Sequence, residues 1–94
     1  MGDFDPPLDA GIVRAVIVLR EAGVETYESC QGGKGHSFLE PTVRFHGGKS
    51  EGLRALAAAQ VHGLPVAALR RVWSVIDLEP TGPFWELTFI DPVG

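Results

Sequence analysis

One segment of the chain combines a cysteine, a histidine and three glycines within a few residues. The segment CQGGKGHS follows a run of β-forming residues and has the composition of a loop. Glycines let a ligand approach the backbone closely, and lysine and histidine side chains supply hydrogen-bond donors. The sequence therefore predicts a ligand-binding loop, with a plain connector as the alternative. The expected ligand-contacting residues are Gly32, Gly33, Lys34, Gly35 and His36.

A second segment, RFHGGKS, runs from a strand through a diglycine turn to Lys-Ser at the start of a helix. Backbone N–H groups at a helix N-terminus attract anions, and a lysine adds positive charge. A complete nucleoside triphosphate loop would need glycine where the chain has Val43, so that class of site is excluded. We expect Arg44, His46, Lys49 and Ser50 to contact an anionic ligand. The alternative is a simple turn in which Ser50 caps the helix.

A third candidate site is a platform of arginine and tryptophan side chains on the last two strands: Arg70, Arg71, Trp73 and, across the hairpin, Trp85. Arg71 and Trp73 are alternate residues, so their side chains share one face of the strand. A guanidinium group binds phosphate and an indole ring stacks on a nucleobase, which suits recognition of a nucleotide. The alternative places a tryptophan in the core and leaves the arginine in solvent.

Catalysis by the lone cysteine is a weaker prediction. Cys30 has His36 or His46 as a candidate base, but a small buried cysteine after a strand is the commoner arrangement. Zinc ligation by Cys30 and the three histidines is disfavoured, because the chain has neither a CxxC nor an HxxxH pair. We expect no metal and no cofactor, and we lean away from an enzyme.

Composition limits the classes of protein to which the chain can belong. With 94 residues we expect one domain over residues 1–94, preceded by an acidic tail over residues 1–7. The single cysteine and the absence of a long apolar run predict a cytoplasmic protein with no membrane contact. The net charge is −4, and both ends are acidic while most basic residues lie between residues 30 and 74. This pattern favours a small anionic ligand over a long nucleic acid.

Two helices and four strands must position these residues. Hydrophobic periodicity and the glycine and proline positions predict an α+β fold, a two-layer sandwich of order α-β-β-α-β-β. Both helices would lie on one face of a mainly antiparallel sheet, leaving Arg44, His46, Arg71 and Trp73 on the other. The expected helices are 8–22 and 50–63; the expected strands are 24–29, 42–46, 70–78 and 84–90, with a turn at EPTGP over 79–83.

The stretch GVETYESCQGGKGHSFLEPTVRFHG resembles the signature of a family of small uncharacterised phage and bacterial proteins, as do GLPVAALRRVW and EPTGPFWELTF. This resemblance covers most of the chain and implies no particular activity. Ser29, Cys30 and Gly32 are also similar to a Ser-Cys-x-Gly turn of tRNA wybutosine-synthesising methyltransferase-like proteins. In style alone, the chain is similar to phage proteins that sequester nucleotide immune signals.

From these features we predict a non-enzymatic binding module for a small anionic ligand, most plausibly a nucleotide. A chain this short buries a limited share of its surface, so we also expect a homo-oligomer. One alternative is a Cys/His-dependent enzyme acting on a nucleotide or RNA. A second alternative is a protein–protein inhibitor that uses a sheet face bearing tryptophan and arginine.

Overall fold

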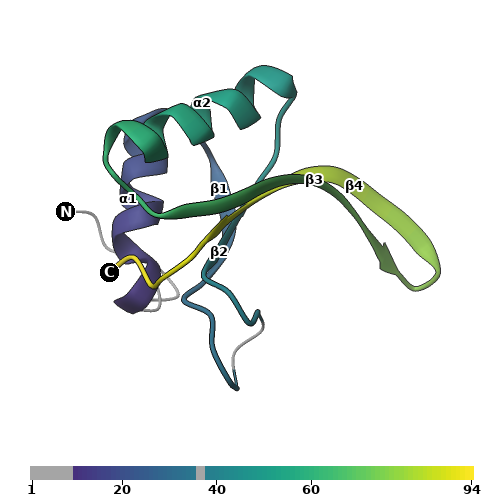
Figure 1. The fold of residues 1–94 in the computed structure, drawn as a ribbon. Coiled ribbons are helices and arrows are strands. Elements are labelled where there is room, and N and C mark those ends of the chain that lie inside the picture. Colours follow the sequence, from purple (N-terminus) through teal and green to yellow (C-terminus); the bar gives the residue numbers. More distant parts are fainter. Residues whose placement is uncertain (1–9, 36–37) are drawn as a thin grey trace.

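A computed structural model describes residues 10–35 and 38–94 of the chain (Figure 1). None of the helices in this part of the chain is long and apolar enough to cross a membrane. The predicted acidic tail and the first residues of the predicted first helix lie outside the described residues. The elements are a 3-10 turn η1 (Ala10–Ile12), α1 (Val13–Glu21), β1 (Thr26–Cys30), β2 (Thr42–Phe45), α2 (Lys49–Val61), β3 (Val66–Ile76) and β4 (Glu79–Phe89).

The four strands form one antiparallel sheet in the order β1-β2-β4-β3. Both helices pack against the same face of this sheet (Figure 1). The predicted α+β class and the order α-β-β-α-β-β are therefore confirmed. Because β4 is inserted between β2 and β3, the central strands of the sheet are β2 and β4.

The core lies between the helices and the covered face of the sheet. Val43 and Phe45 alternate with Arg44 on β2, and both are fully buried. Their cross-strand partners on β4 are Leu87 and Trp85, which therefore lie on the same face. The remaining core residues come mainly from both helices and from segments that border the sheet: Ile12, Ala15, Val16, Val18, Leu19, Val24, Ala55, Ala59, Leu64, Phe89 and Val93.

The hairpin turn differs from the sequence prediction. Asp77 and Leu78 form the turn, with φ angles of 51° and 68°, whereas the predicted turn residues EPTGP belong to β4. A register shift in the β3–β4 pair, between Val72 and Ser74, accommodates this segment as a bulge. The prediction followed the proline and glycine content, which here marks a bulge and not a chain reversal.

Both strands are longer than predicted, with 11 residues each, because β3 begins four residues earlier, at Val66, and β4 begins five residues earlier, at Glu79. β2 pairs with only the Trp85–Thr88 part of β4. The distal part of the hairpin, residues 73–83, extends past this pairing and projects away from both helices (Figure 1). We call residues 73–83 the arm.

The second helix also begins differently from the prediction. Gly48 is its N-cap residue, without a side-chain cap hydrogen bond, so Ser50 lies inside the first turn and is not the cap. Gly52 lies one turn into α2 and faces the Trp85 ring. A Cβ atom at Gly52 would lie 2.6 Å from two atoms of that ring.

We expect Gly52→Ala to destabilise the protein by about 1–3 kcal/mol, because the methyl group overpacks the contact with Trp85. Alanine has the higher helix propensity, so propensity alone gives the opposite sign. Urea unfolding measures the difference. Gly48→Ala is the control, since a Cβ there meets nothing within 4 Å. A stabilised Gly52→Ala variant would contradict this packing.

Candidate functional site

Three charged side chains lie in a row across the uncovered face of the sheet. Arg44 on β2 is the cross-strand partner of Glu28 on β1 and of Glu86 on β4. Its guanidinium group donates hydrogen bonds to Glu28 Oε1 at 3.1 Å and to Glu86 Oε2 at 3.0 and 3.1 Å. Arg44 is therefore held by two carboxylates, one from each neighbouring strand.

Aromatic rings also flank this arginine. The Arg44 guanidinium carbon lies 4.8 Å from the centre of the Phe84 ring and 4.6 Å from that of Phe38. These are cation–π distances. Only 20% of the Arg44 side chain remains exposed. An anionic ligand at this guanidinium would have to compete with both carboxylates.

Tyr27 and His46 extend the same face. Their rings stack with centres 4.3 Å apart, and Tyr27 meets Phe84 edge-on at 6.0 Å. Burial raises the pKa of the Tyr27 phenol, Arg44 lowers it, and Glu28 and Glu86 raise it, with a net shift upward from its ordinary value of 10.0. The predicted neighbours Arg44 and His46 are thus on one face, but both are engaged by side chains of the protein.

Arg71 lies on the opposite face from Arg44, contrary to the sequence prediction. It is the cross-strand partner of Trp85, which in turn pairs with buried Phe45. The Arg71 guanidinium carbon lies 4.6 Å from the centre of the Trp85 ring, and its NH1 donates to the Gly47 carbonyl at 2.6 Å. The strand order explains the error, since β4 separates β2 from β3 and fixes their faces through its own register.

The Trp85 side chain also holds the Gly47-Gly48 turn in place. Trp85 Nε1 donates to the carbonyl of Gly48 at 2.9 Å and to that of Gly47 at 3.2 Å. The turn therefore directs carbonyl groups towards the sheet. Lys49 and Ser50 follow it and are exposed at the start of α2.

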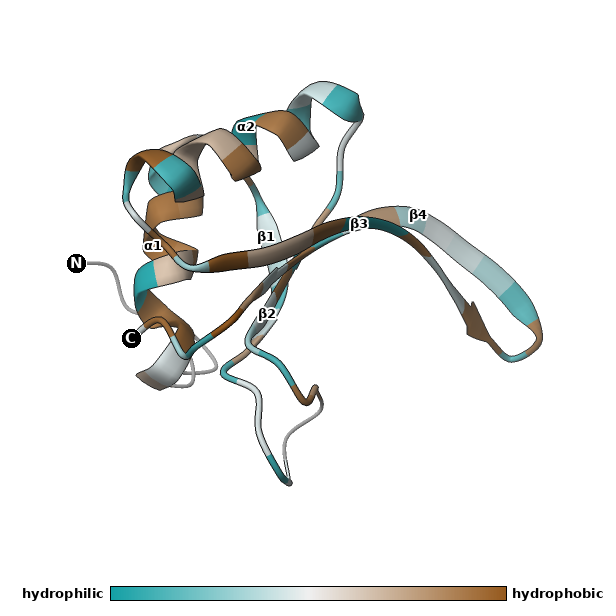
Figure 2. Ribbon diagram, in the orientation of Figure 1, coloured by the Kyte–Doolittle hydropathy of each residue, from teal (hydrophilic) through white to brown (hydrophobic). Residues whose placement is uncertain are grey.

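Trp73 is the first residue of the arm and lies two residues beyond Arg71 on β3. Its side chain is 58% exposed. Sequence reasoning selected Trp73 but missed its exposed apolar neighbours, Val75, Ile76 and Leu78, whose exposed fractions are 69, 59 and 94%. The sequence did contain a signal for this: apolar residues occupy successive positions at the end of β3, so they lie on both faces of the strand. Such a pattern is expected where neither face is covered by a helix of the same chain. Figure 2 shows the end of β3 as hydrophobic.

The glycine-rich loop joins β1 to β2. The Gly33 N–H donates to the Leu39 carbonyl at 2.9 Å, and a Cβ at Gly32 would lie 2.5 Å from the backbone beside Pro41. Lys34 and Gly35 are exposed at the loop tip. His36 lies outside the described residues. Gly32 therefore serves the close packing of the loop, whereas Gly35 has a φ of 87° and open space around it.

Cys30 ends β1 and is buried, with 4% exposure. Its Sγ accepts a hydrogen bond from the Gly32 N–H at 3.4 Å. This is the environment of a packed thiol at a strand end. Of the two bases considered for it, His46 is stacked on Tyr27 and His36 lies outside the described residues.

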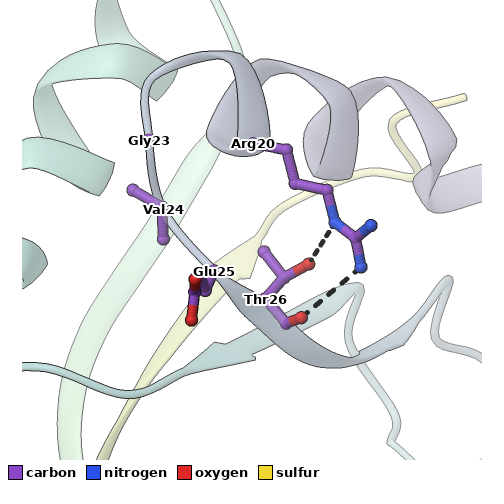
Figure 3. A pocket seen from close by; sticks show the side chains of 5 residues that line it. All are labelled: Arg20, Gly23, Val24, Glu25 and Thr26. Carbon is purple, nitrogen blue, oxygen red and sulfur yellow. Dashed lines mark hydrogen bonds between the residues drawn. The ribbon is translucent and has the colours of Figure 1, made fainter. Parts of the chain in front are cut away.

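A pocket of about 490 Å³ lies beside the end of α1 and the start of β1 (Figure 3). Arg20 crosses it and donates to the Thr26 hydroxyl oxygen at 3.0 Å. None of the residues predicted as ligand contacts lines this pocket. Its lining residues are Arg20, Gly23, Val24, Glu25 and Thr26.

Across residues 10–35 and 38–94, no three or more His, Cys, Asp or Glu side chains are grouped so that they could hold a metal ion. No family model, curated protein or solved structure matches the chain. Function must therefore be inferred from the chain's own residues and their geometry.

We expect Arg44→Met to destabilise the protein by about 2 kcal/mol, because it leaves two carboxylates beside each other without their shared partner. Arg70→Met is the matched control. Arg70 is 54% exposed and lies 3.8 Å from Glu86, so its loss should cost less than about 0.5 kcal/mol. Equal effects of the two variants in urea unfolding would contradict a structural role for Arg44.

The Tyr27 phenol should titrate above pH 10.0 in the folded protein. Tyr27 is the single tyrosine of the chain, so phenolate absorbance reports on it alone. Because the folded pKa is raised, the stabilising contribution of the neutral phenol is complete below pH 10 and is lost as pH rises through the folded pKa. The urea-unfolded chain gives the reference titration. A folded midpoint at or below that reference would contradict the assigned environment.

Proposed function

We propose that this protein is a non-enzymatic binding module that contacts another polypeptide through its arm, by pairing an extended strand with the outer edge of β3. The observation that carries the proposal is the exposure of four large apolar side chains on an element that projects from the body (Figures 1 and 2). Exposed apolar patches of this kind mark interaction sites.

The shape of the arm favours a polypeptide over a small molecule. Two strands with no helix above them offer an edge and two faces, whereas small ligands bind in concave sites. A strand edge presents unpaired N–H and C=O groups to a partner strand, and flanking side chains then give specificity. The partner we propose is accordingly an extended, proline-free segment with apolar side chains.

The engaged arginines support this proposal over nucleotide binding. Arg44 has two carboxylate partners, and Arg71 is stacked on Trp85 and donates to the Gly47 carbonyl. A phosphate at either position would have to replace those contacts. Trp73 is two residues from Arg71 on β3, so the phosphate-binding group beside the predicted base-stacking residue is one that Trp85 and the Gly47 carbonyl already engage. Tight nucleotide binding in calorimetry would contradict this proposal and support the predicted binding of a small anionic ligand.

Site-specific photo-crosslinking in cells that express the chain tests the proposal. A benzoyl-substituted phenylalanine replaces Trp73 in one variant and Val61 in a control. Val61 is apolar and 82% exposed but lies at the end of α2, away from the arm. We expect the probe at position 73 to give protein adducts in several-fold greater yield than the probe at position 61.

A second variant makes the test specific for strand pairing. Val75→Pro removes a backbone donor at the outer edge of β3, so it should abolish the adducts at position 73, whereas Val75→Thr should retain them. Equal yields at positions 73 and 61 would overturn the proposal.

A further inference from the structure

The edge strands of the sheet, β1 and β3, differ in length and in how readily another strand could pair with them. β1 is a short edge strand of five residues whose pairing with β2 is irregular between Thr26 and Glu28. In the arm, the outer side of β4 carries Pro80 and Pro83, which have no N–H group to donate. β3 has eleven residues and no proline. Long apolar edge strands without such blocking residues are sites of strand addition.

The backbone groups of β3 that face outward can be identified. The Thr81 hydroxyl donates to the Ser74 carbonyl at 3.3 Å, so this carbonyl points towards β4. Successive residues of an antiparallel strand direct their N–H and C=O groups to alternate sides. Trp73 and Val75 therefore direct their backbone groups to the outer edge of β3.

The odd-numbered residues of this segment direct their backbone groups to the outer edge of β3. In a symmetric pair of β3 strands, hydrogen bonds therefore join odd-numbered residues of one subunit to odd-numbered residues of the other. When the axis passes through Ser74, Trp73 lies opposite Val75 of the partner subunit. The axis repeats this pair with the two subunits exchanged, and the residues of each pair exchange backbone hydrogen bonds. In the same register, Arg71 and Asp77 of the partner subunit lie beyond the ends of the paired segment, because Asp77 belongs to the turn and Arg71 is held by Trp85 and the Gly47 carbonyl. On the other face, Val72 lies opposite Ile76 of the partner subunit.

The sequence of β3 is thus complementary to itself in this register. Aromatic–aliphatic pairs of Trp73 with Val75 meet on one face of the paired segment and aliphatic pairs of Val72 with Ile76 on the other, as cross-strand stabilisation requires. The antiparallel arrangement places the two bodies at opposite ends of the paired arms, because each arm projects away from its own helices (Figure 1).

On this basis we infer that the partner of the arm is a second copy of this chain, joined by antiparallel pairing of residues 72–76 of the two β3 strands about an axis at Ser74. This inference rests on the proposed function and names its partner. Pairing at β3 places the Trp73 side chain against that of Val75 of the partner subunit and joins two four-stranded sheets into one of eight strands.

A disulfide at the axis tests the register. Directly opposed residues that do not exchange hydrogen bonds have Cα atoms about 4.5 Å apart, within the range for a disulfide. Ser74→Cys in a Cys30→Ser background should therefore give a cross-linked dimer under mild oxidation. Val72→Cys and Ile76→Cys in the same background are controls, since neither faces its own copy. They should cross-link only when the two variants are mixed.

Sedimentation at high micromolar concentration gives an independent measurement. The wild-type chain and Val75→Thr should be dimers, and Val75→Pro a monomer with unchanged circular dichroism of its helices.

A monomeric wild-type chain, or a Ser74→Cys yield no higher than that of the single controls, would overturn the inference. Photo-adducts from position 73 to other proteins, together with a monomeric pure chain, would overturn it and leave the proposed function in place. Absence of any adducts at position 73 would contradict both the inference and the proposed function.

Discussion

The contact between the Trp85 ring and the first turn of α2 determines how the rest of the molecule is arranged. The ring packs against Gly52, and its N–H bonds to the two carbonyls of the Gly47-Gly48 turn. Arg71 closes the contact by lying over the ring and donating to Gly47. One side chain of β4 thereby fixes the helix start, the preceding turn and the neighbouring strand β3.

This contact marks the boundary between the body and the arm. On the body side of Trp85, β4 is flanked by both β2 and β3 and covered by the helices; on the other side only β3 accompanies it. An isolated two-stranded hairpin is marginally stable in water. The arm residues therefore gain little from the core, and burying their apolar side chains requires a surface outside this chain.

The coarse fold was predictable because it depends on local signals. Glycines end both helices, Val43 and Phe45 alternate with polar residues, and two helices on one side of four strands is the simplest packing of such elements. The positions of Arg44 and Arg71 depend instead on strand order and register, which the spacing along the chain does not contain. Inserting β4 between β2 and β3 separates the two arginines onto opposite faces, and the Gly82-Pro83 bulge was mistaken for the turn because its composition is that of a turn.

The turn at the tip of the arm holds an exposed apolar residue in an unfavourable backbone conformation. Leu78 has a φ of 68° and is 94% exposed, although the left-handed region costs an L-residue of this kind about 1 kcal/mol or more. Glycine or asparagine would relieve that cost and remove an apolar side chain from water. Strain and apolar exposure coincide at one residue, beyond the segment proposed to pair. Both features favour a contact of the tip side chain with a surface outside this chain.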